Sequence, residues 1–137
     1  MPGILLVGHG DLPAALLSSA RMIGGALPGV RALGLQPGET PESFRDRVAE
    51  ALDADDVEVV LSDLAGGTPD NVVGVLARTR PGLRVIAGAS LPLLLELAIG
   101  TPELDNDSLD RVIERAGPLL RSRTQSRETE PTSRGAD

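Results

Sequence analysis

The chain contains a single histidine, His9, and the residues around it make it the first candidate for chemistry. It follows an apolar run, residues 3–8, which is typical of a buried strand, and it precedes Gly10. A histidine at the carboxyl end of a strand lies where open α/β proteins carry out their chemistry. Because the chain has no cysteine and no tyrosine, His9 is the leading candidate for a nucleophile or acid–base group near neutral pH. The alternative is a strand-end histidine that only hydrogen-bonds to backbone.

A second group of polar residues follows the third predicted strand. Asp63 lies just past that strand, and Gly66-Gly67-Thr68 opens the next helix. If the first and third strands are neighbours, Asp63 can bond one ring nitrogen of His9 and fix its tautomer. The two glycines and the Thr68 hydroxyl, together with backbone N–H groups at a helix start, could then bind an oxyanion or a phosphate. The alternatives are that Asp63 and Thr68 cap helices and that the glycines only form a tight turn.

These residues need elements that position them, and the apolar periodicity predicts strands that alternate with helices. We expect strands at residues 3–8, 30–35, 57–61 and 83–87, and helices at 12–27, 40–52, 71–79, 92–99 and 108–120. This alternation predicts an α/β fold, a doubly wound parallel sheet of four strands in order 2-1-3-4 with helices on both faces. Residues 1–120 are expected to form one domain, and residues 121–137 a disordered tail.

Composition excludes several classes of function. The chain of 137 residues carries a net charge of −7, which argues against binding to the phosphate backbone of nucleic acids. It has no cysteine and no lysine, which excludes thiolate and lysine chemistry. No apolar run is long enough for a membrane helix and no targeting segment is evident, so we expect a cytoplasmic protein that does not insert into the membrane.

Three motifs together resemble one known family. They are residues 7–10 (Val-Gly-His-Gly), 63–71 (Asp-Leu-Ala-Gly-Gly-Thr-Pro-Asp-Asn) and 85–93 (Val-Ile-Ala-Gly-Ala-Ser-Leu-Pro-Leu), which follow the first, third and fourth predicted strands. In this order and spacing, over roughly residues 3–120, they resemble enzyme IIA of the mannose family, a phosphocarrier domain of the bacterial sugar phosphotransferase system.

The resemblance implies a phosphotransferase component that works through a phosphohistidine, without cofactor or metal. His9 would take a phosphoryl group from the histidine-containing phosphocarrier protein and pass it to enzyme IIB or to a kinase or regulatory acceptor. In this scheme Asp63 is the second catalytic residue and orients the ring, while Gly10, Gly66, Gly67 and Thr68 bind the phosphate. Family members commonly form homodimers by exchanging a carboxyl-terminal strand, so a homodimer is expected.

The chain departs from the family pattern at three positions. Ala65 stands where an aromatic residue is common, and Asp70 stands where an aromatic or apolar residue is common. Asp11 adds a carboxylate directly after the reactive loop. Negative charge close to a phosphohistidine repels phosphate unless the carboxylates point away from it.

Three other functions fit parts of the sequence. The phosphocarrier domain that feeds dihydroxyacetone kinase shares the fold and the histidine, and the sequence barely separates it from the first hypothesis. Residues 5–15 are similar to the opening of sirohydrochlorin-type metal chelatases, although one histidine makes a poor metal site. The third alternative is a non-catalytic regulatory module that holds phosphate without transferring it.

Overall fold

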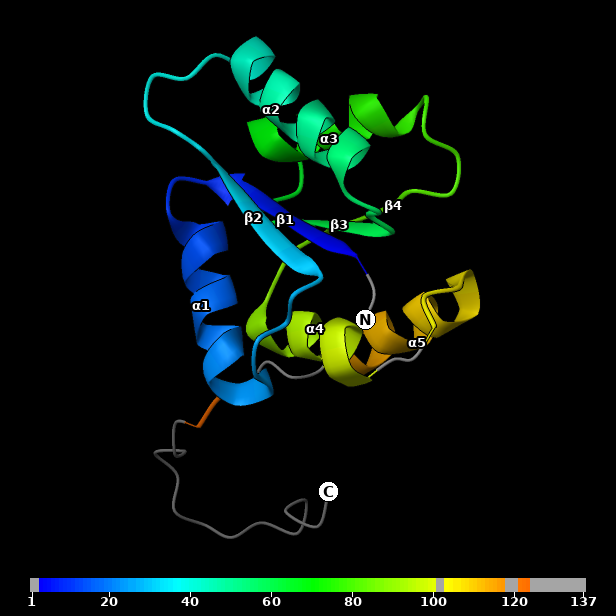
Figure 1. Ribbon diagram of the computed structural model, residues 1–137. Helices are drawn as coiled ribbons and strands as arrows, with labels where there is room; N and C mark the ends of the chain where they lie inside the picture. Colours follow the sequence, from blue (N-terminus) through cyan, green and yellow to red (C-terminus); the bar gives the residue numbers. More distant parts are fainter. Residues whose placement is uncertain (1–2, 101–102, 118–120, 124–137) are drawn as a thin grey trace, which may run out of the picture.

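The computed structural model describes residues 3–100, 103–117 and 121–123. In this part of the chain one parallel sheet is formed by β1 (Ile4–His9), β2 (Val30–Leu35), β3 (Val59–Ser62) and β4 (Arg84–Ala87). The strand order is β2-β1-β3-β4 (Figure 1), which confirms the predicted α/β fold and its topology.

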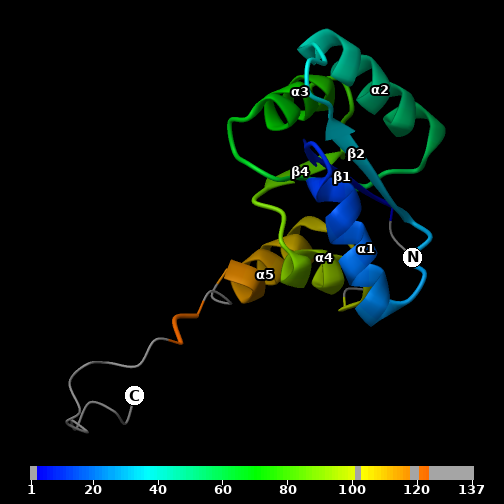
Figure 2. The ribbon, with the colours of Figure 1, turned by 90° about the vertical axis from the view of Figure 1, so that its left-hand side faces the viewer.

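Helices cover both faces of this sheet, as predicted. One face carries α2 (Pro41–Ala54) and α3 (Thr68–Ala77). The other carries α1 (Leu12–Gly24), α4 (Leu91–Leu95) with the π-helix η1 (Glu96–Gly100), and α5 (Asn106–Ala116). The view in Figure 1 and the view turned by 90° in Figure 2 both show this division into three layers.

The central strand β1 contributes side chains to two separate apolar clusters. Ile4 and Leu6 pack with α1, α4, η1 and α5, whereas Leu5 and Val7 pack with α2 and α3. This follows from strand geometry, since successive side chains point to opposite faces of a sheet. Phe44 is the only Phe, Tyr or Trp of the chain. It belongs to α2 and is fully buried in the second of these clusters.

Element boundaries differ from the prediction where glycine or proline chemistry decides them. α1 ends at Gly24 instead of residue 27 because Gly25 takes φ +88°, a left-handed conformation that stops a helix. α3 begins at Thr68, three residues earlier than predicted, because Gly67 is its N-cap and Pro69 fits its first turn. β3 begins later than predicted, at Val59.

The carboxyl-terminal helices also differ. The single helix predicted at 92–99 is α4 followed by the π-helix η1. α5 starts at Asn106 because the Asp105 side chain accepts the Ser108 N–H at 2.8 Å and caps it. Residues 118–120 of the predicted last helix, and the predicted tail apart from residues 121–123, lie outside the described residues.

An ion pair fixes the connection from β2 to α2. The Arg47 guanidinium donates to both carboxylate oxygens of Glu39, at 2.8 and 2.9 Å, and to the Gly34 carbonyl at 2.7 Å. This fork-like geometry is the strong form of an arginine–carboxylate pair. A Cβ atom at Gly34 would overlap the Gly10 carbonyl oxygen, so the end of β2 lies directly against the loop that follows His9.

We expect Glu39→Gln to lower the melting temperature at neutral pH. The hydrogen bonds from Arg47, and next the Gln36 N–H, lower the pKa of Glu39 from 4.5 to about 2. A carboxyl whose pKa is lower in the folded state stabilises the fold above its ordinary pKa, and this contribution is lost as the pH falls through the folded value. The deficit of the variant should therefore shrink between pH 4.5 and about 2, as measured by thermal melts in a pH series.

Glu50→Gln is the matched control, since Glu50 is an exposed acid of the same helix for which the described residues show no ion pair. Its melting temperature should follow the parent at every pH. A Glu39→Gln deficit that does not depend on pH would contradict the assigned ion pair.

Candidate functional site

The parallel register brings His9 and Asp63 together at the carboxyl edge of the sheet. Val7 of β1 pairs with Ser62 of β3, so the residues that follow each of them emerge side by side. One carboxylate oxygen, Asp63 Oδ2, accepts the backbone N–H of His9 at 2.9 Å and lies 2.9 Å from the ring atom Nδ1. Asp63 caps no helix, because the N-cap of α3 is Gly67.

Electrostatics assign the proton on this ring. Burial raises the pKa of the Asp63 carboxyl, but hydrogen bonds from the backbone and ring of His9 outweigh burial and hold it below the ordinary 3.8. An ionised carboxylate can only accept hydrogen bonds, so Nδ1 carries a proton, and in the neutral ring the lone pair is then on Nε2. The His9 side chain is 47% exposed and that of Asp63 is 10% exposed. The pair therefore combines a half-exposed imidazole ring with a largely buried carboxylate.

The second carboxylate oxygen strengthens this pairing. Among the described residues, no hydrogen-bond donor reaches Asp63 Oδ1, although the atom is buried. A buried oxygen without a donor is costly, and the charge it shares with Oδ2 is not dispersed over other partners. The carboxylate therefore depends on the backbone N–H and the ring of His9 for compensation.

Two glycines make room for this geometry. A Cβ atom at Gly8 would lie 2.8 Å from Asp63 Cγ, so only glycine lets the carboxylate cross β1 at this point. A Cβ atom at Gly67 would lie 2.9 Å from Cε1 of the His9 ring and 3.5 Å from Nε2. The turn before α3 thus lies in contact with the ring edge beside the reactive nitrogen.

The predicted phosphate-binding glycines use their N–H groups within the protein. Gly10 donates to the Leu35 carbonyl at 2.8 Å, and Gly67 donates to the Leu64 carbonyl at 3.1 Å. Gly66, at φ +82°, donates to a carboxylate oxygen of Asp70 at 2.9 Å. These three groups are therefore engaged in the arrangement that the structure shows.

Thr68 differs from these glycines in its hydrogen bonding. In the part of the chain that the structure describes, neither its hydroxyl nor its N–H donates to another protein group. It is the first residue of α3 and follows Gly67, which contacts the ring. A helix start with unused N–H groups favours an anion.

Two site residues were not expected from the sequence, Asp70 and Ser62. Asp70 was noted only as a departure from the family pattern, but its side chain accepts the Ser62 hydroxyl at 2.6 Å besides the Gly66 N–H. The available signal was an acid in the first turn of a helix that follows a glycine turn. Ser62 gave no signal, because the third strand was predicted to end at residue 61 and Ser62 to begin the loop, whereas it is the last residue of β3.

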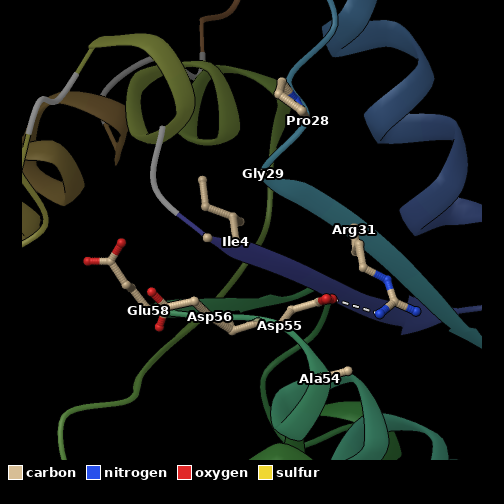
Figure 3. A pocket seen from close by; sticks show the side chains of 10 residues that line it. Ile4, Pro28, Gly29, Arg31, Ala54, Asp55, Asp56 and Glu58 are labelled. Carbon is tan, nitrogen blue, oxygen red and sulfur yellow. Dashed lines mark hydrogen bonds and ion pairs between the residues drawn. The ribbon is translucent and has the colours of Figure 1, made fainter.

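Cavities occur both beside this site and away from it. One of about 240 Å³ is lined by Thr68 together with residues of α2 and α3. Another of about 400 Å³ lies at the amino-terminal edge of the sheet, where Arg31 and Asp55 form an ion pair of 2.7 Å (Figure 3). Its walls include the residues just before and at the starts of β1 and β2, at the opposite strand ends from His9. The described residues contain no group of three or more His, Cys, Asp or Glu arranged to hold a metal ion.

A helix that crosses a bilayer must be both long and apolar. None of the helices in the described ranges combines the length and apolarity that a bilayer crossing requires.

Comparison with known proteins gives concordant matches. The family model described as "PTS system fructose IIA component" matches residues 3–116. The sorbose-specific EIIA component of Klebsiella pneumoniae is 36% identical over 107 residues, which are 77% of this chain and 78% of that protein. The mannose/sorbose-specific IIA subunit of Enterococcus faecalis has a TM-score of 0.82 at 27% identity, covering 93% of this chain and 98% of that one.

A further solved structure, the PTS IIA protein associated with the fucose utilization operon of Streptococcus pneumoniae, has a TM-score of 0.75 at 32% identity, covering 88% of this chain and 92% of that one. These matches span almost all of the described fold, whereas the similarity to chelatases is confined to residues 5–15. The chain therefore belongs to the mannose/sorbose type of IIA components of the sugar phosphotransferase system, within the family described as fructose IIA.

Proposed function

We propose that this IIA component is a phosphocarrier that accepts a phosphoryl group on Nε2 of His9 and passes it to an enzyme IIB partner. The observation that carries the proposal is the hydrogen bond between His9 Nδ1 and Asp63 Oδ2, 2.9 Å long, on a ring that is 47% exposed. The pair fixes the tautomer that a nucleophilic Nε2 needs, before any phosphate is present.

The transfer step balances with the groups at hand. The Nε2 lone pair attacks the phosphorus of the donor's phosphohistidine, the donor's N–P bond breaks, and the bonding electrons stay on the donor imidazole. The His9 ring keeps its proton on Nδ1 and becomes an N-phosphoryl imidazolium, whose positive charge faces the Asp63 carboxylate. Onward transfer to the acceptor reverses these changes, with Asp63 holding the ring in place throughout.

Thr68 is proposed to bind the transferring phosphoryl group through its unused hydroxyl and N–H. Gly10, Gly66 and Gly67 would shape the phosphate site, since their own N–H groups are engaged. Leu12 and Leu64, which are 52% and 59% exposed, follow the two halves of the site along the chain. We propose them as part of the apolar surface on which a partner protein docks.

The partners follow from this chemistry. The proposed donor is the histidine-containing phosphocarrier protein, and the proposed acceptor is enzyme IIB, with a dihydroxyacetone kinase or a regulatory protein as the alternative acceptor. All of these act in the cytoplasm, where we also place this chain. A homodimer is proposed from the family alone.

Phosphorylation tests the proposal directly. With phosphoenolpyruvate, enzyme I and the phosphocarrier protein, the parent should gain one phosphate that is labile in acid and stable in base. His9→Gln should gain none, because His9 is the single imidazole of the chain. Intact-mass spectrometry after each treatment gives the result, and phosphate on Ser or Thr, or phosphate that persists in the variant, would falsify the assignment.

Asp63→Asn should slow phosphoryl transfer by on the order of a hundredfold or more while the fold is retained. If the amide oxygen replaces Oδ2, the NH₂ group occupies the position of Oδ1, a buried atom that makes no hydrogen bond within the described residues. If the amide turns over, it faces the His9 N–H and favours the wrong ring tautomer.

The effect of Asp63→Asn is measured as a single-turnover rate of phosphate transfer. Circular dichroism is the folding control. Asp110→Asn, at an exposed acid of α5, is the matched variant and should transfer like the parent. If Asp63→Asn transfers as fast as the parent, the proposed role of the pair in catalysis is wrong.

Thr68→Ala should cause a smaller loss of roughly tenfold. It removes one hydrogen bond to a charged acceptor, worth about 1.5 kcal/mol or more, but leaves the Thr68 N–H in place. Thr68→Ser retains the hydroxyl and should recover the parent rate in the same single-turnover assay. A serine variant as slow as the alanine variant would show that the hydroxyl is not the group that matters.

A further inference from the structure

The Gly66-Gly67 turn contacts the reactive ring, yet its sequence gives it little intrinsic rigidity. Glycine loses more conformational freedom on folding than any other residue, and Gly66 takes a left-handed conformation at φ +82°. Gly67 is the residue whose Cβ, if present, would lie 2.9 Å from Cε1 of His9. Some external contact must therefore hold this turn against the imidazole.

Asp70 provides that contact through both of its carboxylate oxygens. Oδ2 accepts the Gly66 N–H at 2.9 Å, and Oδ1 accepts the Ser62 hydroxyl at 2.6 Å. The neighbouring Asn71 donates through its side chain to the Gly66 carbonyl at 3.2 Å. Both polar backbone groups of Gly66 are thus held by the first turn of α3.

Ser62 links the Asp70 side chain to the sheet. The residue is fully buried at the end of β3, and its carbonyl accepts the N–H groups of Gly88 and Ala89 at 2.9 and 2.8 Å. One residue later in the chain, Asp63 holds the His9 ring. The loops after β3 and β4 and the start of α3 therefore meet at a single buried serine.

We propose that Asp70, anchored on Ser62, is a positioning residue that locks the Gly66-Gly67 turn against the His9 ring. The turn then fixes the ring edge beside Nε2 and keeps the donors of Thr68 at a constant place relative to it. We assign this role to the geometry of the carboxylate, because each of its two oxygens accepts a hydrogen bond inside the loop. The effect on transfer rests on the proposed phosphocarrier function.

Asp70→Ala and Asp70→Asn separate geometry from charge. Alanine removes both acceptors. In the asparagine variant the amide oxygen can accept the Gly66 N–H while the NH₂ group donates to Ser62 Oγ, whose hydroxyl can rotate. We expect alanine to slow single-turnover phosphorylation of His9 by roughly tenfold to a hundredfold, the effect of small displacements in a reacting geometry. Asparagine should stay within about threefold of the parent, well inside that range.

A second readout does not depend on phosphate. Because His9 is the only imidazole, its Hε1 proton is a single identifiable signal in NMR spectra. The parent should show a nuclear Overhauser effect between this proton and a Gly67 Hα, and slow exchange of the Gly66 amide. Alanine should lose the first and accelerate the second, whereas asparagine and the surface control Asp110→Ala should retain both.

Ser62→Ala provides a further variant that keeps the Gly66 bond but removes the anchor. Its Gly66 amide should exchange faster than in the parent and more slowly than in Asp70→Ala. Parent-like exchange in Ser62→Ala would overturn the anchoring. A folded Asp70→Ala with the parent's rate and Overhauser effect, or an asparagine variant as slow as alanine, would overturn the proposal. A parent that takes no phosphate refutes the phosphocarrier function. The NMR readouts still test whether Asp70 holds the Gly66-Gly67 turn against the His9 ring.

Discussion

The site depends on one oxygen atom that accepts two N–H groups of the same residue. Because Asp63 Oδ2 bonds both the backbone and the ring of His9, it fixes the side-chain torsions of the histidine at the same time as its tautomer. The remaining features can be understood as conditions for this arrangement. Gly8 leaves the space that the carboxylate crosses, and the pairing of Val7 with Ser62 brings the two strand ends level. The reactive nitrogen is therefore oriented by a single carboxylate, which the paired ends of β1 and β3 hold in place.

Much of the fold followed from the sequence because its strongest signals were periodic. Runs such as Ile4–Val7 predict a strand buried on both faces, and alternation with amphipathic helices leaves few topologies. Boundaries were harder, since they depend on local interactions that periodicity does not report. The start of α3 depends on Gly67 acting as N-cap, and the π-helix at Glu96–Gly100 continues an apolar pattern that reads equally well as an ordinary helix.

The site was partly predictable for a similar reason. A parallel sheet gathers its carboxyl ends at one edge, so the meeting of His9 and Asp63 could be expected from strand order alone. The destinations of single N–H groups could not, because they depend on ångström-scale turn geometry. Gly66 illustrates the difference, since it is available to an anion in principle but is bonded to Asp70 in the structure. Likewise, the steric need for glycine at position 34 arises from a loop 24 residues earlier in the chain.

The way β1 serves two clusters also bears on how the protein opens. Helices α1 and α2 each belong to one cluster, whereas β1 and β3 supply side chains to both. Fluctuations that detach an outer helix can expose one cluster and leave the other packed, because partial openings generally follow such cooperative units. The central strands separate from each other only when both clusters are lost. The His9–Asp63 pair, at the ends of these two strands, should therefore persist through partial unfolding and disappear only in the global transition.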